Sequence, residues 1–214
     1  MPAGQHTRRT PALEAAARDV AAACAARLTR VAGTHGLLLD ASACMPVPAV
    51  AGLARWTALR SDAADAGWRG AVRADATRLP FADDACCAVL ACFVDAADAA
   101  LAVELARVLA PHGTLLVAAF RTRTAWHCGV APGPWMRVLR AAGLDVLPAR
   151  RCAAPWPRAR GVDGLPHWLV HWSGGVWLLE ARRSVLTALP LCRAKARRAL
   201  EPDALLPGVR RECA

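Results

Sequence analysis

Two carboxylates in the chain stand at the ends of short strand-like runs, where a side chain can reach a ligand. Asp40 closes residues 36–40, and Asp75 closes residues 70–75. If both runs are parallel strands, both acids lie at the carboxyl edge of the sheet, where open α/β sheets bind their ligands. Each acid can also act as a cap or turn residue, because a short carboxylate accepts hydrogen bonds from nearby backbone. Both roles stay open for these two residues.

Histidine and cysteine spacing gives little support for a metal or redox site. His167 and His171 stand four residues apart, as two ligands on one helix face would. No third ligand is apparent, and the flanking Trp168 and Trp172 favour a packed aromatic patch. The nine cysteines contain no C-x-x-C pair. We expect four of them to be small buried hydrophobes, namely Cys24, Cys86, Cys87 and Cys92.

Composition says more about the genome than about function. Lysine occurs once, at Lys195, so arginine supplies nearly all of the positive charge. Richness in alanine and arginine indicates codon bias, and we discount it as a functional signal. The net charge of +10 favours polyanions such as nucleic acid in general. The densest basic run, residues 182–198, has no aromatic residues beside it, so nucleic acid is a possible but not a favoured partner.

Residues 1–10 are polar and basic, and no apolar segment of useful length follows them. No uninterrupted apolar run approaches the ~18 residues of a membrane-spanning helix. We therefore predict a cytoplasmic protein with reduced cysteines and no membrane partner.

Apolar spacing predicts helices that alternate with strands. Thr10 and Pro11 begin a helix, and Gly33 is the predicted stop. Its apolar face consists of Leu13, Ala17, Val20, Cys24, Leu28 and Val31. Further helices are expected around residues 50–59, 98–109 and 134–142, and strands at 36–40, 70–75, 86–91, 114–120, 144–147 and 176–181. This alternation predicts a mainly parallel sheet.

The helix predicted at residues 98–109 begins at the capping residue Asp98. It carries Glu104 and Arg107 as a neighbouring pair on its outer face. By organisation, residues 1–35 form an N-terminal helical segment, residues 36–183 form the α/β domain, and residues 184–214 form a basic tail.

Residues 74–120 read A-D-A-T-R-L-P-F-A-D-D-A-C-C-A-V-L and then E-L-A-R-V-L-A-P-H-G-T-L-L-V. They resemble the type 11 family of class I S-adenosylmethionine-dependent methyltransferases. The family shows D-A-x-x-L-P-F-x-D-x-S-F-D-x-V and a helix that ends E-x-x-R-V-L-x-P-G-G-x-L. The resemblance implies a Rossmann-like sheet with an antiparallel last strand. The chain is also similar to small, divergent bacterial members that degrade the first motif and end in a basic tail.

The resemblance also implies a cofactor-binding site with three parts. These are a glycine-rich turn after strand one, an acid at the end of strand two for the ribose, and an acid after strand three for the adenine. Asp75 and Ala76 match the adenine side. Asp40, Ser42 and Cys44 match the end of strand one and its turn, and Cys92 at the end of the fourth strand completes the candidate set.

The chain departs from the family at several of these positions. Ser42, Cys44 and Pro46 stand where the family has glycines, and their side chains crowd the backbone that should approach the cofactor. A βαβ unit alone takes about 30 residues, so the interval from Asp40 to Asp75 implies a reduced strand-two region. The ribose acid is missing there, and the displaced substitutes are Asp62 and Asp65. In the fourth strand, Cys86-Cys87 replaces Phe-Asp.

Two candidate groups remain around the site. Four tryptophans could line a substrate pocket, although core or lid packing is favoured: Trp126, Trp135, Trp156 and Trp168. His112 replaces the first glycine of the P-G-G turn and is interpreted as a tolerated surface residue.

The predicted function is S-adenosylmethionine-dependent methyl transfer to an unidentified acceptor. The alternative is a catalytically inactive methyltransferase-like scaffold that binds or regulates through its basic surface. A nicotinamide-dependent oxidoreductase is disfavoured, because no G-x-G-x-x-G follows the first strand.

Overall fold

The computed structural model describes residues 11–61, 67–75, 77–94, 96–121, 130–152 and 175–183. All of them lie in one unit, Met1–Ser184. The helices are α1 (Pro11–Leu28), α2 (Ala99–Val108) and α3 (Pro132–Ala141). The strands are β1 (Gly33–Asp40), β2 (Leu53–Ser61), β3 (Gly67–Gly70), β4 (Arg73–Asp75), β5 (Cys86–Cys92), β6 (Leu109–Phe120), β7 (Asp145–Val146), β8 (Arg150–Cys152) and β9 (Val176–Arg182).

The strands form one sheet in the order β4-β3-β2-β1-β5-β6-β9-β7, with β8 paired to β9 off this path. β1 is parallel to both β2 and β5, and β5 is parallel to β6. β9, the last strand, runs antiparallel to β6. The predicted mainly parallel, Rossmann-like sheet with an antiparallel last strand is therefore confirmed.

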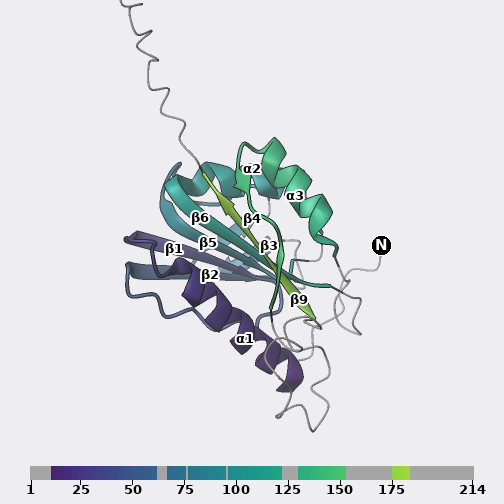
Figure 1. Ribbon diagram of the computed structural model, residues 1–214. Helices are drawn as coiled ribbons and strands as arrows, with labels where there is room; N and C mark the ends of the chain where they lie inside the picture. Colours follow the sequence, from purple (N-terminus) through teal and green to yellow (C-terminus); the bar gives the residue numbers. More distant parts are fainter. Residues whose placement is uncertain are drawn as a thin grey trace, which may run out of the picture. The chain divides into compact units, whose positions relative to one another are not determined.

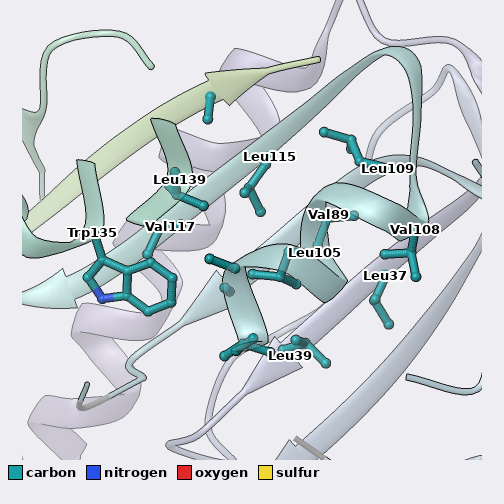
Figure 2. Close-up of a cluster of buried hydrophobic side chains, with 14 of the residues drawn as sticks. Leu37, Leu39, Val89, Leu105, Val108, Leu109, Leu115, Val117, Trp135 and Leu139 are labelled. Atoms are coloured by element: carbon teal, nitrogen blue, oxygen red, sulfur yellow. The ribbon is translucent and has the colours of Figure 1, made fainter. Parts of the chain in front are cut away.

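Helices cover both faces of the sheet (Figure 1), with α1 on one face and α2 and α3 on the other. Beneath α1 lies a cluster that includes Leu13, Val20, Leu38, Leu90 and Leu116. The opposite cluster is drawn in Figure 2, where side chains of α2 and α3 meet those of the sheet; it includes Leu37, Leu39, Val89, Leu105, Val108, Leu115, Val117, Trp135 and Leu139. Burial of each such side chain contributes roughly 1.5–3 kcal/mol, so these clusters fix the sheet that carries the site.

Several local predictions are confirmed. Helix α1 buries the predicted apolar face, with Leu13, Ala17 and Leu28 at most 1 % exposed. Asp98 caps α2 by accepting a hydrogen bond from the Ala100 backbone N–H at 2.9 Å. Gly143 ends α3 with φ 84°, a left-handed conformation that glycine adopts without strain. None of the described helices has the length and apolar character needed to span a membrane.

The predicted helix around residues 50–59 is wrong, because this segment is strand β2. Its alanines favour a helix locally, yet it pairs with β1 from Gly33↔Leu53 to Asp40↔Arg60. Side chains alternate along β2: Trp56 and Ala58 pack towards the α1 cluster, while Leu59 enters the opposite one. Pairing and two-sided burial outweigh helix propensity here. The predicted shortening of this region is seen between β1 and β2, where residues 41–61 contain no helix.

Three boundaries also differ from prediction. Gly33 does not end the first helix; it begins β1, where an added Cβ would overlap the side chain of Cys87. Residues 70–75 are not one strand, because a turn separates the end of β3 from β4 and makes an antiparallel pair. Leu109 belongs to β6 rather than to α2, although it is buried as expected.

Gly70 allows the close approach of β3 to β2, and replacing it tests that packing. A Cβ at this position would overlap the carbonyl oxygen of Ala58 on the neighbouring strand. We expect Gly70→Ala to lower the free energy of unfolding by about 1–3 kcal/mol, measured by urea denaturation. The matched control is Gly133→Ala in α3, where a Cβ meets nothing within 4 Å. Equal effects of the two substitutions would contradict the proposed close packing at Gly70.

Candidate functional site

The carboxylate of Asp40 is buried at the end of β1 and serves its own loop. Its Oδ1 accepts hydrogen bonds from the backbone N–H of Ser42 at 2.9 Å and from the Ser42 hydroxyl at 2.7 Å. Its Oδ2 accepts from the backbone N–H of Met45 at 2.7 Å. Because Asp40 is 0 % exposed and both oxygens are engaged, it holds the turn that follows β1.

That turn keeps its path without glycine. Ala43 has φ 54°, in the left-handed region that glycine occupies most easily. The Ser42 hydroxyl accepts a hydrogen bond from the Cys44 backbone N–H at 3.2 Å, and Ser42 and Met45 are each 1 % exposed. Side chains therefore fill and tie the turn at the place where the resemblance implies a bare backbone.

Cys92, at the end of β5, is buried beneath α1. Its carbonyl oxygen accepts a hydrogen bond from the Ala41 backbone N–H at 3.0 Å. Interaction with the Cys24 thiol, reinforced by burial, holds the pKa of the Cys92 thiol well above its ordinary value. Cys24, Cys86 and Cys92 are buried, as predicted, whereas the prediction for Cys87 is wrong, because its side chain packs only partly against the α1 cluster. A buried thiol of raised pKa stays protonated and inert, so Cys92 contributes packing and a backbone acceptor.

Asp75 lies at the end of the outer strand β4 with its side chain exposed. Its Oδ1 accepts hydrogen bonds from the Thr77 backbone N–H at 2.8 Å and from the Thr77 hydroxyl at 2.9 Å. The Thr77 backbone hydrogen bond, with the hydroxyl bond, holds the pKa of the Asp75 carboxyl below its usual range. The carboxylate of Asp75 therefore stabilises its own turn, which was the alternative to binding a ligand. Its cofactor-binding role stays a prediction. Ala76 lies outside the described residues.

Asp40 has an arginine beside it at the end of β2. Arg60 is its ladder partner, Arg69 is the partner of Arg60, and Arg73 is the partner of Arg69. Directly opposed residues project from the same face of a sheet, so the three arginines form a row on the face that α1 partly covers. We call Arg60, Arg69 and Arg73 the arginine row.

Sequence reasoning missed Arg60 because its segment was assigned to a helix. The pattern that could have identified this strand is Trp-Thr-Ala-Leu-Arg at residues 56–60. Apolar residues there face both sides of a strand, and a charged residue follows them.

A pocket of about 320 Å³ opens between the loop after β1 and the first turns of α1. Its lining comprises Glu14, Arg18, Ala43, Cys44, Met45, Pro46 and Arg60. Two guanidinium groups face one carboxylate, so the lining carries a net positive charge. The pocket lies at the carboxyl ends of β1 and β2, where the open-sheet rule places ligands.

Four residues in the most specific part of the resemblance bind one another, and we call them the clasp: Leu79, Phe81, Glu104 and Arg107. Arg107 of α2 donates hydrogen bonds to the carbonyl oxygens of Leu79 at 3.1 Å and Phe81 at 2.9 Å. It also pairs with Glu104 at 2.8 Å and with Asp83 at 2.6 Å. Glu104 in turn accepts from the backbone N–H of Leu79 at 3.0 Å. The predicted Glu104–Arg107 pair is confirmed, and it ties α2 to the Leu-Pro-Phe segment.

Other candidate residues take structural positions or fall outside the described part. Trp135 is 0 % exposed within the core of α3 and the sheet, as the favoured interpretation required. His112 is exposed, as predicted, but it lies within β6 rather than in a turn, with φ 61° where the register of β6 with β5 shifts. Seven candidates lie outside the described residues: Asp62, Asp65, Trp126, Trp156, His167, Trp168 and His171. Within the described residues, no group of three or more potential metal-binding side chains converges.

The described lining does not fit S-adenosylmethionine. The sulfonium of that cofactor is cationic, and Arg18 and Arg60 repel it more than Glu14 alone attracts it. Its ribose hydroxyls need acceptors, and the guanidinium of Arg60 has none to offer. The carboxylate of Asp40 is buried and already accepts three hydrogen bonds from its own loop.

Comparison with known proteins supports the fold. No protein-family model matches the chain, and no curated protein matches it either. It is similar to a structure of the Haloferax volcanii Trm112 methyltransferase activator with a chain described as a methyltransferase; the match has TM-score 0.52 and 17 % identity, and covers 86 % of this chain and 100 % of the other.

Two further solved structures are similar at lower scores. One is an S-adenosylmethionine-dependent methyltransferase from Thermotoga maritima, at TM-score 0.47 and 12 % identity over 79 % of this chain and 92 % of the other. Another is from Mesorhizobium loti, at TM-score 0.46 and 13 % identity over 76 % and 96 %. At such identities the likeness is one of fold, so the conclusion rests on strand order and the Haloferax match. The chain has the Rossmann-like fold of the class I methyltransferases.

Proposed function

We propose that this chain is a methyltransferase-fold binding module that does not transfer methyl groups from S-adenosylmethionine. The observation that carries the proposal is Arg60, which stands beside Asp40 at the end of β2, where the family resemblance implies an acid. An arginine there donates hydrogen bonds and adds positive charge, whereas the cofactor brings hydroxyl donors and a sulfonium cation.

The turn after β1 supports the same proposal. Both carboxylate oxygens of Asp40 bind residues of this turn, and Ser42 and Met45 are buried within it. A cofactor that needs a glycine-lined backbone meets side chains of Ala43, Cys44 and Pro46 at the pocket wall. Another ligand can bind at the same edge of the sheet without a glycine turn or a ribose acid.

Methyl transfer from S-adenosylmethionine to an unidentified acceptor is the second candidate. One observation favours it: Glu14 and Arg18, one helical turn apart, both line the pocket. A carboxylate beside a guanidinium matches the ammonium and carboxylate of the cofactor's amino-acid end. Further predictions go with this candidate: membership of the type 11 family, a bacterial origin and a cytoplasmic location. The division of the chain into residues 1–35, 36–183 and 184–214 also stays a prediction. Nucleic-acid binding through residues 184–214 likewise stays a prediction.

Calorimetric titration with S-adenosylmethionine and with S-adenosylhomocysteine separates the two candidates. For the binding module we expect no saturable heat and no rise in Tm at millimolar ligand, because the lining repels the sulfonium and Arg60 offers the ribose no acceptor at the end of β2.

The contrary outcome is also specific. Saturable binding that Asp75→Ala weakens, while the exposed control Asp145→Ala leaves it intact, would establish the cofactor site and overturn the binding-module proposal. Asp145 suits the comparison because it is an exposed aspartate on β7, beyond β9 in the sheet order.

A further inference from the structure

The pocket between α1 and the loop after β1 has charged groups on two sides. Arg18 enters from α1, and Arg60 enters from the end of β2. Among the described residues, Arg60 makes no hydrogen bond or ion pair. The hydrogen bond of Arg18 uses its Nε, which lies 3.4 Å from the carbonyl oxygen of Glu14. The terminal nitrogens of both guanidinium groups can therefore bind a ligand.

The positive charge extends beyond the pocket along the arginine row. Arg69 and Arg73 follow Arg60 on successive strands and are exposed. The side chains of Arg69 and Arg73 have interactions of their own. They therefore act through the positive electrostatic potential that they add around the pocket. Like charges directly opposite on neighbouring strands repel each other, and an anion bound at the first of them offsets that repulsion.

We infer that this pocket binds a small ligand that carries a phosphate group, held between Arg18 and Arg60; the inference rests on the proposal that S-adenosylmethionine is not the ligand. Guanidinium groups bind phosphate oxygens in paired, charge-assisted hydrogen bonds. The carboxylate of Glu14, on the same lining, accepts hydrogen bonds from hydroxyl groups of the ligand. A volume of about 320 Å³ suits a phosphate ester of small-molecule size.

A small ligand fits better than a nucleic-acid strand. Single-stranded nucleic acids bind on exposed aromatic side chains that stack with the bases. The large exposed apolar side chains of the described residues are aliphatic: Val47, Val72, Val103 and Leu147. Trp56, the aromatic residue of β2, is partly buried against the α1 cluster.

Pyrophosphate is the probe for this inference, titrated calorimetrically into the full chain at low and at physiological salt. We expect one site per chain, and about tenfold or greater weakening in Arg60→Gln, since a charge-assisted pair of hydrogen bonds is lost. Arg18→Gln is the second variant and should weaken binding similarly from the other wall. The matched control is Arg55→Gln, which removes the same charge from the same strand but from its opposite face.

The outcomes separate this inference from the proposed function. Equal weakening by Arg55→Gln and Arg60→Gln, or several equivalent sites, would mean that net charge alone attracts the anion and would overturn the inference. Binding of an RNA oligonucleotide through Arg60 without binding of pyrophosphate would also overturn it. Saturable binding of S-adenosylmethionine with intact pyrophosphate binding would defeat the binding-module proposal while leaving the anion site in place. Loss of pyrophosphate binding only in the two pocket variants, each with a native Tm, supports the inference.

Discussion

Replacing Asp40 with alanine is expected to lower the free energy of unfolding by about 2–4 kcal/mol. The substitution removes the acceptor for the backbone N–H groups of Ser42 and Met45 and for the Ser42 hydroxyl. Ser42 and Met45 are each 1 % exposed, so water cannot replace these hydrogen bonds without opening the loop. The destabilisation therefore includes the desolvation penalty of buried donors that have no acceptor.

Urea denaturation of the wild type, Asp40→Ala and Asp40→Asn measures this effect. Asparagine keeps one acceptor oxygen and cannot accept at both positions, so we expect an intermediate loss of stability. Asp145→Ala, an exposed aspartate of β7, controls for the removal of one negative charge and should change stability little. An Asp40→Ala variant as stable as this control would show that the loop does not depend on the carboxylate, and would free Asp40 for a ligand-binding role.

Most of the sheet could be predicted because its strands are encoded by local sequence. Residues 86–91 are apolar throughout, and residues 114–120 are apolar after Thr114, as strands buried on both faces are. Both appear in the structure, as parts of β5 and β6. Asp98 and Gly143 carry local capping signals, and helices α2 and α3 begin and end next to them. Such features need only a few neighbouring residues to be identified.

Strand β2 could not be predicted because its stability comes from pairing far along the chain. Residues 53–61 contain alanine, leucine and arginine, which favour helices when considered alone. Their partners in β1 are about twenty residues earlier in sequence, and a local pattern does not reveal such a partner. The site could not be predicted for the same reason, because Arg60 lies beside Asp40 and lines the pocket only when this segment is a strand.

The resemblance of residues 74–120 to methyltransferases predicted the fold, and the clasp gives the reason. Leu79, Phe81, Glu104 and Arg107 belong to the most recognisable part of the pattern, and they bind one another. A sequence can therefore retain this pattern for the stability of the sheet and α2 after its cofactor-binding residues have changed. The clasp and the pocket are separable, which allows them to be tested independently.

Arg107→Ala is expected to lower the free energy of unfolding by about 2–3 kcal/mol. It removes hydrogen bonds to the carbonyl oxygens of Leu79 and Phe81 and leaves the carboxylate of Glu104, which is only 14 % exposed, without its cation. Arg107→Lys keeps the charge but not the forked geometry, so we expect only partial recovery. Arg140→Ala, in the last turn of α3, is the matched control, and an equal loss of stability there would contradict the clasp.

The pH dependence of stability provides a second readout of the same clasp. The hydrogen bond from Arg107 holds the pKa of the Glu104 carboxyl below its ordinary value. A carboxyl whose pKa is lower in the folded state stabilises the fold above its unfolded pKa, and this contribution is lost as the pH falls through the folded pKa. The stability difference between the wild type and Glu104→Gln should therefore be largest near neutral pH and should narrow between about pH 5 and about pH 3. A difference that stays constant over this interval would assign the effect to packing of the side chain, because a glutamine of the same size does not titrate.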